Sequence, residues 1–341
     1  MLTKILGIAL GFFLLGNAVR ADDTFVALAA GGLVPMDPTT IQVESEEVEI
    51  TPRRITIHYV FRNPGDQDES PTIAFSLPDL DGMAMCASPY HLPRKNEVNF
   101  MGFNLLSGGK PIPTQMDLQA YREGQDVTSR LAAAGITANL LQEPLNAALL
   151  KMPPEERDKL EAEGLIEAEK FAAPLEITGK RRGWCAQWTM RVRFSWTQPI
   201  GAHEAIELTQ VYSPVVGGTP LMPTSDASTY GGSYCAGPEL ISTIAPMRVE
   251  AAQGKDKDKD VKPLLYEQAI DFVLTNANKW NGPIGVFHLT VLTLTQNDML
   301  MTCMSGLQRT GPTRYEFQKD NFQPREELRL MILQKTRPWG W

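Results

Sequence analysis

The segment that most constrains the fold is WCAQWTMRVRFSW, residues 184–196. Apolar residues occupy every even position, and polar residues occupy the odd positions from 187 to 195. A period of two is typical of a half-buried β-strand, so we expect a long strand with its tryptophan-rich face in a core. The same row of tryptophans could form a carbohydrate platform, but strands of this kind usually bury such rows. Cys185, on the opposite face, is expected at the rim.

Alternating segments recur on both sides of this strand. Val43 and Val48 are out of phase within one such segment, which predicts a β-bulge or break between them. We therefore predict a mainly β chain, with two β-sandwich-like antiparallel sheet regions and a short helical insert. Further strands are expected at 54–62, 72–77, 203–218, 264–275, 284–295, 299–304, 313–319 and 327–334.

The middle of the chain has a different pattern. Asp126 is a suitable N-cap and Gly135 a suitable stop, while the pair Pro153 and Pro154 and then Gly164 bracket a later segment. These signals predict about three short helices that form a cap or arm on the sheet. The expected organisation is a leader at 1–21, a β-rich region at 22–116, a helical insert at 117–170 and a β-rich region at 171–341, which can pack with the N-terminal strands as one unit.

The first residues resemble a secretory signal peptide. Lys4 precedes an apolar run at 5–15, and small residues end at Ala21, where we expect cleavage. Eleven apolar residues are too few to span about 30 Å of hydrocarbon, and no later segment reaches 18 apolar residues, so no stable membrane insertion is expected after cleavage. Loss of Lys4 and Arg20 changes the net charge from −8 to −10. We predict a periplasmic or secreted protein without a nucleic-acid partner, because nucleic acids require a basic surface.

The chain has four cysteines, and an even number in an exported protein predicts two disulfides. Three pairings are open at this point. No two cysteines have the close spacing of a structural metal site, so we expect neither a metal nor a cofactor.

No motif supports catalysis. His203 begins HEAIE, but Glu207 stands where a zinc protease needs its second histidine. Ser233 lies in GGSYCAG, where Cys235 replaces the glycine of a nucleophile elbow. The acidic residues at 44–49 are expected on a solvated strand edge. The four histidines are scattered along the sequence without ligand spacing: His58, His91, His203 and His288.

These observations favour a non-catalytic binding or interaction module whose partner is an envelope protein or a glycan. The candidate binding loop is the polar segment that contains Ser228, Tyr230, Ser233 and Tyr234, because loops at the ends of sandwiches often carry binding. The alternative is an envelope hydrolase that acts on glycans, which would need a pocket with two facing carboxylates and a tryptophan wall.

The segment NKWNGPIGVF, residues 278–287, could be a ligand loop or the entry to a strand. The apolar and β-branched residues that follow it favour the strand, with Gly282 and Pro283 as the preceding turn. Trp280 is then expected to cover one end of the core.

Several blocks together resemble the bacterial domain-of-unknown-function family 4424, an exported and β-rich family. The longest are ALAAGGLVPMDPTTIQVESEEVEI, NANKWNGPIGVFHLTV and GLQRTGPTRYEFQKDNFQPREELRLMIL, and they occur in order along nearly the whole chain. The resemblance implies no reaction. It does imply a disulfide between Cys235 and Cys303, because the family pattern places one cysteine in the block YCAGPEL and another in the strand before GPT. Cys86 and Cys185 would then form the second disulfide.

Overall fold

The structure is a computed structural model, and most of the chain after the expected leader is described. The leader at 1–21 and Ser228 lie outside the described part. The described residues are 27–87, 90–141, 145–168, 183–218, 220–221, 230–239, 242–244 and 265–335.

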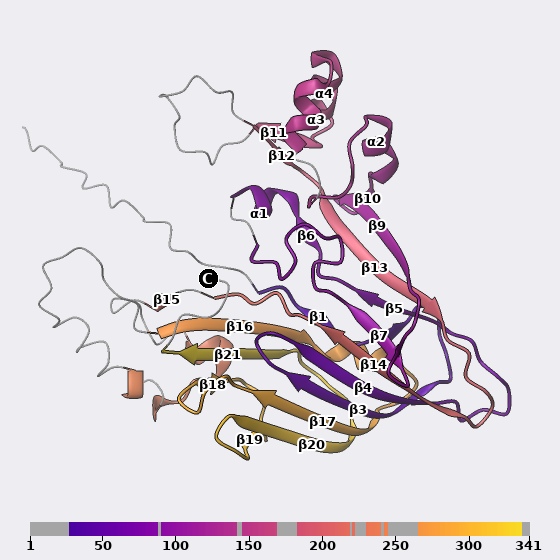
Figure 1. Cartoon of the computed structure of the whole chain (residues 1–341), viewed down its shortest axis with the longest axis vertical. Coiled ribbons are helices and arrows are strands. Elements are labelled where there is room, and N and C mark those ends of the chain that lie inside the picture. Colours follow the sequence, from indigo (N-terminus) through magenta and orange to yellow (C-terminus); the bar gives the residue numbers. More distant parts are fainter. Residues whose placement is uncertain are drawn as a thin grey trace, which may run out of the picture.

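One layer of the molecule is a single eight-stranded sheet (Figure 1). Its side chains alternate between the core and solvent, as the period-two patterns predict; in β4, for example, every second residue from Ile55 to Phe61 is buried. In spatial order the strands are β19 (Gln308–Arg309), β20 (Arg314–Phe322), β17 (Ile284–Leu292), β3 (Gln42–Ile50), β4 (Ile55–Arg62), β14 (Ala205–Tyr212), β7 (Asn104–Ser107) and β8 (Lys110–Pro111).

The other layer consists of two smaller sheets. The first has the order β1 (Ala30–Gly31), β16 (Leu265–Val273), β21 (Leu328–Gln334) and β18 (Met299–Met301), with β15 (Pro220–Leu221) also pairing with β16. The second has the order β10 (Gln125–Asp126), β9 (Gln115–Arg122), β13 (Thr189–Thr197), β5 (Thr72–Ser76) and β2 (Val34–Pro35), with β6 (Leu80–Asp81) also pairing with β13. Side chains from all three sheets share one hydrophobic core.

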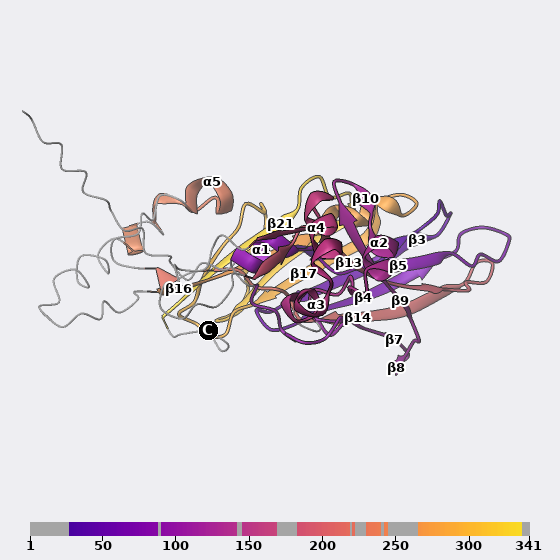
Figure 2. The ribbon, with the colours of Figure 1, turned by 90° about the horizontal axis from the view of Figure 1, so that it is seen from above.

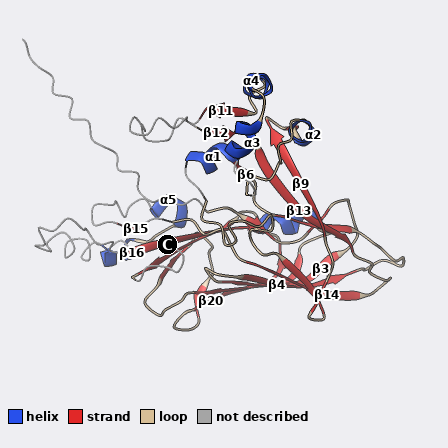
Figure 3. Ribbon diagram, turned by 45° about the horizontal axis from the view of Figure 1, so that its top comes forward, coloured by secondary structure: helices blue, strands red, loops and turns tan. Residues whose placement is uncertain are grey.

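The helices are short and most of them lie at one end, where β9 and β13 extend away from the sandwich (Figures 1 and 3). A small α5 lies elsewhere, against β21 (Figure 2). The helices are α1 (Gly82–Ala87), α2 (Thr128–Ala133), α3 (Leu145–Lys151), α4 (Pro154–Ala162), α5 (Tyr230–Tyr234) and the 3-10 helix η2 (Leu274–Lys279); β11 (Ile166–Ala168) and β12 (Trp184–Ala186) form a two-stranded sheet beside α3 and α4.

The two halves of the sequence are interleaved in space. Strand β17 pairs in parallel with β3, and β16 pairs in parallel with β1. Strand β13 lies beside β5, and β14 beside β4. The chain is therefore mainly β, as predicted, and strands from its N-terminal and C-terminal β-rich regions pair within the same sheets. The two parallel pairs depart from the antiparallel expectation, because each joins strands from opposite ends of the sequence.

The tryptophan-rich segment is split into β12 and β13, with residues 187–188 between them. Its even positions face inward: Trp188 is 2% exposed and Trp196 is 7% exposed. The tryptophan face is thus a core face, and the carbohydrate platform is ruled out there. Cys185 is also buried, because it forms a disulfide with Cys86 instead of standing at an open rim.

The predicted bulge is present in β3, where the register with β4 shifts between Val43 and Ser45. The shift turns Glu46 toward the core, in phase with Val48 and Ile50. The expectation of a solvated edge for this acidic segment is wrong, because β3 lies between β4 and β17 in the middle of the large sheet.

The middle of the chain forms the three short helices that were predicted, α2, α3 and α4. Pro154 is the first residue of α4, and Gly135 and Gly164 follow helices with positive φ values of 71° and 67°. Residues 117–126 belong to β9 and β10, so the helical insert proper begins after Asp126, whose carboxylate accepts a hydrogen bond of 2.9 Å from the Thr128 N–H. We use "helical insert" below for residues 127–168.

The insert has a small hydrophobic core of its own, separate from that of the sandwich. Leu131, Leu149 and Leu160 are fully buried in it, one from each helix, and Trp188 of the β12–β13 segment closes it from below. The indole N–H of Trp188 donates to the Ala138 carbonyl at 3.1 Å.

The segment at 278–287 enters a strand, as predicted. Gly282 has a φ of 88°, and β17 begins two residues later at Ile284. Trp280 is 5% exposed, packs on Phe61 with ring centroids 4.5 Å apart and donates to the Leu33 carbonyl at 2.9 Å. It covers one end of the core.

The structure joins Cys86 to Cys185 and Cys235 to Cys303, and this is the pairing implied by the family resemblance. The first disulfide fastens α1 to β12. The second fastens the residue after α5 to the second residue after β18.

Candidate binding site

A pocket of about 480 Å³ lies at the end of the sandwich that carries the β3–β4 turn. We call it the hairpin-end pocket. Strand β14 runs antiparallel to β4 and β17 runs parallel to β3, so both end beside this turn. The topology thus brings together Pro52 and Arg53 from the turn, Leu294 after β17, and the three residues Ser213, Pro214 and Val216 after β14.

The charges at this pocket have one sign. Arg53 and Lys95 are exposed at it, and His91 also lines it, whereas no carboxylate is among its lining residues. Burial and the positive charge of Lys95 lower the pKa of His91, so its imidazole is neutral near pH 7. A pocket with only positive charges is unusual on a chain of net charge −8, and it favours an anionic ligand.

The opposite layer contributes Gln268 of β16 to the pocket. This residue is on the inner face of its strand, in phase with Ile270 and Phe272, and is 6% exposed. Its side-chain oxygen is buried and has no hydrogen-bond partner. A buried acceptor of this kind costs about 1–3 kcal/mol when unpaired. Rotation about the broad terminal torsion of glutamine would present the amide to a ligand in the pocket.

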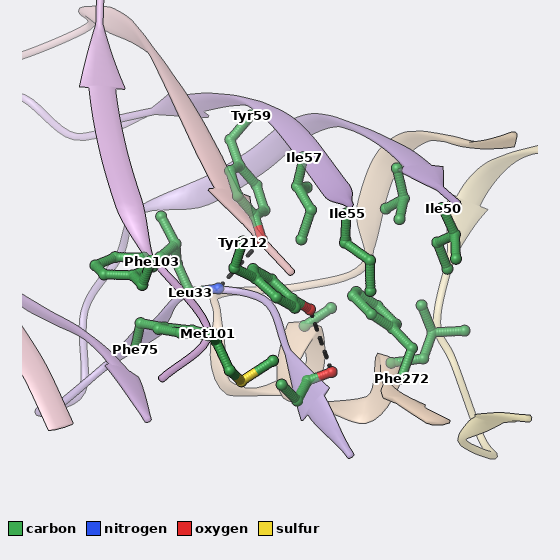
Figure 4. Close-up of a cluster of buried hydrophobic side chains, with 14 of the residues drawn as sticks. Leu33, Ile50, Ile55, Ile57, Tyr59, Phe75, Met101, Phe103, Tyr212 and Phe272 are labelled. Carbon is green, nitrogen blue, oxygen red and sulfur yellow. Dashed lines mark hydrogen bonds between the residues drawn. The ribbon is translucent and has the colours of Figure 1, made fainter. Parts of the chain in front are cut away.

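A second polar group lies deeper, in the core between the layers. Tyr59, Gln210 and Tyr212 are almost fully buried, and the Tyr59 hydroxyl donates to the Gln210 side-chain oxygen at 3.2 Å. The same hydroxyl accepts from the Leu33 N–H at 3.1 Å (Figure 4). Tyr212 bonds to the Ala30 carbonyl at 3.4 Å. These bonds hold the segment that carries β1 and β2 between the layers.

Glu46 is the only acidic residue among the described residues of this buried group, and it is 3% exposed. Burial raises its pKa to about 8, so the carboxyl is protonated near neutral pH. Burial, together with the Glu46 carboxyl, also raises the pKa of Tyr59 and that of Tyr212. A Cβ at position 32 would overlap the Tyr59 hydroxyl, which explains why this residue is a glycine. This buried group belongs to the fold, because none of these side chains lines the hairpin-end pocket.

The residues of the predicted binding loop occupy a different place. Tyr230 is 4% exposed and its hydroxyl donates to the Glu267 carboxylate, while Tyr234 is half-buried. Both pack on the outer face of the β16–β21 sheet, in a third small core. Ser233 is exposed. The binding role of this loop stays a prediction, but its tyrosines hold α5 on the sheet.

Two of the scattered histidines are neighbours in the fold. Glu47 of β3 stands opposite His58 of β4 and His288 of β17 on the outer face of the large sheet. His58 shares a hydrogen bond of 3.0 Å with the Thr209 hydroxyl, and His288 Nε2 lies 3.6 Å from a Glu316 oxygen. The alternating pattern places His58 on the face opposite Ile55 and Phe61, but the sequence does not show that β17, with His288, lies beside β3.

This row does not form a metal centre. Within the described ranges, no group of three or more histidine, cysteine, aspartate or glutamate side chains has an arrangement that could hold a metal ion.

The comparisons with known proteins concern the whole chain. The model of DUF4424, a domain of unknown function, matches residues 21–331 of the 341 residues. The chain belongs to the DUF4424 family. The resemblance noted in the sequence is therefore confirmed, and it extends across both layers and the helical insert.

This DUF4424 protein matches none of the curated proteins compared with it. A crystal structure of a candidate nutrient-binding protein from Legionella pneumophila aligns with a TM-score of 0.47 and 13% sequence identity. The alignment covers 91% of this chain and 72% of that chain. A likeness at this level carries no argument about the site.

Among its described residues, the DUF4424 protein has no helix long and apolar enough to cross a membrane. The hollow beside Glu47 and Glu49 is shallow, has a volume of about 240 Å³, and is lined by histidines, threonines and Arg314 with no tryptophan. The only tryptophan that lines a described hollow is Trp188, and no carboxylate lines that hollow. The pair of facing carboxylates with a tryptophan wall, which a glycan hydrolase would need, is thus absent from these hollows.

Proposed function

We propose that this DUF4424 protein is an exported binding protein that takes a small, hydroxylated organic anion, such as a sugar acid, in the hairpin-end pocket. The observation that carries the proposal is the combination of two exposed cations, Arg53 and Lys95, with the buried and unpaired amide oxygen of Gln268 in one pocket without carboxylates.

Each part of the pocket suits one part of such a ligand. The guanidinium of Arg53 and the ammonium of Lys95 suit a carboxylate, since hydrogen bonds to charged partners are the strong ones. Gln268 and Ser213 suit hydroxyl groups. Leu92 and Val216 supply apolar surface for the carbon face of a ring. The volume of about 480 Å³ lies within the usual range for small-molecule sites.

Export is the second part of the proposal. It is supported by the signal-like leader at 1–21 and by two disulfides, which form and persist in oxidising compartments such as the periplasm. Binding small molecules from solution is compatible with the net negative charge, since the positive pocket is local and the rest of the chain is acidic.

Isothermal titration calorimetry of the mature chain with three probes tests the binding. The probes are D-glucuronate, D-glucose, which lacks the charge, and cyclohexanecarboxylate, which lacks the hydroxyls. We expect glucuronate to bind at least about tenfold more tightly than either of the others, because a charge-assisted hydrogen bond contributes about 1.5–3 kcal/mol. If glucuronate and glucose bind equally, or neither binds, the proposal is wrong.

Matched variants place the interaction in the pocket. The double variant R53A/K95A should lose the preference for glucuronate over glucose. The control R54A/K110A makes the same change in net charge at two exposed residues that do not line the pocket, and it should keep the preference. Gln268→Met should weaken glucuronate but not cyclohexanecarboxylate. Equal losses in R53A/K95A and in its control would show that overall charge, not the pocket, governs binding.

A further inference from the structure

The helical insert contains a second hollow, which shares no residue with the hairpin-end pocket. Its volume is about 330 Å³, and we call it the insert pocket. It lies between the segment that follows α2, the start of α3 and Trp188 beneath them. Figure 3 shows these helices grouped at one end of the molecule, away from most of the strands.

Among the described residues, the side chains that line the insert pocket carry no charge. Its apolar surface comes from Ile136, Leu140, Leu145, Ala148 and Trp188. The polar N–H of Trp188 already donates to the Ala138 carbonyl, so this indole presents only its carbon surface to a ligand. A neutral and largely apolar ligand fits such walls, because a charged group would lose its hydration without gaining a partner.

Two polar side chains, Thr137 and Asn139, interrupt this apolar lining. The Thr137 hydroxyl accepts a hydrogen bond of 3.1 Å from the Asn139 N–H. Asn139 is 5% exposed, and its Oδ1 accepts a hydrogen bond of 2.9 Å from the Leu141 N–H. That bond fixes the orientation of the amide, since a flip would place two donors against each other. The atom that remains is Nδ2, which is buried and has no hydrogen-bond partner. A donor left unpaired in this way costs about 1–3 kcal/mol.

We infer that the insert pocket binds a small neutral molecule that has an apolar ring and one acceptor oxygen. The oxygen, as a carbonyl or an ether, accepts from Asn139 Nδ2 after a small rotation of the amide, and the ring packs among Ile136, Leu145 and Trp188. A dry cavity of about 150 Å³ is enough for benzene, so about 330 Å³ accommodates a ring with a short substituent. This site is independent of the anion proposed for the hairpin-end pocket.

The test uses two probes of the same shape. Acetophenone has a carbonyl where α-methylstyrene has a methylene group, so they differ in the acceptor oxygen and hardly in shape. Ligand-observed NMR titration of the mature chain should give an affinity for acetophenone at least about fivefold higher, since one satisfied donor is worth about 1–3 kcal/mol. Equal affinities, or no binding of either probe, would overturn the inference.

Two variants and one direct signal locate the binding. Asn139→Leu should bring the two affinities together without abolishing binding. Ala148→Phe should fill the hollow and abolish both, while leaving anion binding in the hairpin-end pocket unchanged. If Asn139→Leu does not fold, the side-chain amide resonances of Asn139 in the unmodified chain decide the question: they should shift with acetophenone and much less with α-methylstyrene. A preference for acetophenone that survives in folded Asn139→Leu, or amide resonances that do not move, would show that the oxygen is bound elsewhere.

Discussion

The sandwich and the helical insert each bury a hydrophobic core, and each lines one of the two pockets proposed as binding sites, but the two regions differ in size and in charge. The sandwich core draws on three sheets and includes a buried acid, Glu46. The insert core rests on three short helices and has no ionisable member. The hairpin-end pocket is positive, and the insert pocket is uncharged.

The difference shows that the position of a pocket in the fold determines which side chains line it, and so which ligands it suits. The hairpin-end pocket is built from turns, which expose long charged side chains at the ends of strands. The insert pocket lies among the helices above Trp188, where most of the surrounding side chains are apolar. A small core is also a weak one, because buried area grows with the size of the unit. The insert should therefore be the less stable region, and four changes can sharpen or break that comparison.

The largest effect is expected from the double variant C86A/C185A. This disulfide spans a sequence separation of 99 residues and fastens α1 to the strand β12 of the insert sheet. The chain-entropy model assigns up to about 4.7 kcal/mol to a loop of that length, and measured values are often smaller. Hydrogen exchange should show the amides of α2, α3 and α4 losing protection before those of β3 and β4. Uniform loss across both regions would mean that they unfold as one unit.

Glu46→Gln should change the pH dependence of the sandwich. The folded chain holds the Glu46 proton up to about pH 8, whereas the unfolded chain loses it above its ordinary pKa of 4.5. Stability should therefore fall as the pH rises from about 4.5 to 8, by about 4 kcal/mol across that range. Urea unfolding at several pH values should show this slope in the native chain and a flatter curve in Glu46→Gln. Equal slopes would mean that Glu46 is ionised in the fold.

Leu160→Ala removes a fully buried side chain from the insert core. Such a deletion costs about 2–5 kcal/mol, with the lower part of the range applying where the site can collapse. We expect the amides of α4 and β11 to exchange faster, while those of β17 are unchanged. The matched control is Leu150→Ala, which removes the same side chain from a residue that is 59% exposed and should have little effect.

The smallest effect is expected for Arg130→Ala. The guanidinium joins two helices of the insert, with 2.8 Å to Glu163 and 3.0 Å to Glu156. These groups are about one third to one half exposed, and such pairs contribute only about 0.2–1 kcal/mol. The change in the urea midpoint should shrink further at high salt. A loss larger than that of Leu160→Ala would mean that ion pairs, not the apolar core, hold the insert together.

Local patterns in the sequence predicted many elements of the fold but not all of them. Alternation at period two located most of the long strands and the faces they bury, and the phase change between Val43 and Val48 located the bulge. Strands β9 and β10 were missed, because residues 117–126 were assigned to the helical insert. Proline and glycine signals located three helices in the insert. Trp280 was placed in the core from its strand entry alone. These features depend on interactions between residues that are close in sequence, so the sequence carries them directly.

The sites were not predictable in the same way. The binding role given to the loop with Tyr230 and Tyr234 came from loop composition and stays a prediction, but the sequence did not show that both tyrosines pack on a sheet. No sequence pattern indicated the pocket residues Arg53, Lys95 and Gln268, because they share no motif and come from three distant segments. The sequence did not indicate Asn139 either. That its amide nitrogen has no hydrogen-bond partner is known only from the three-dimensional positions of the surrounding residues.

The sequence by itself determined a mainly β chain with a helical insert, an even set of cysteines and membership of the DUF4424 family. Only the tertiary structure decided that β3 pairs with β17, that Glu46 is buried and protonated, and where the two pockets lie. The physical reason is one of range. Periodicity and turn chemistry act between near neighbours, whereas strand pairing, desolvation and pocket shape arise between segments that only the complete fold brings together.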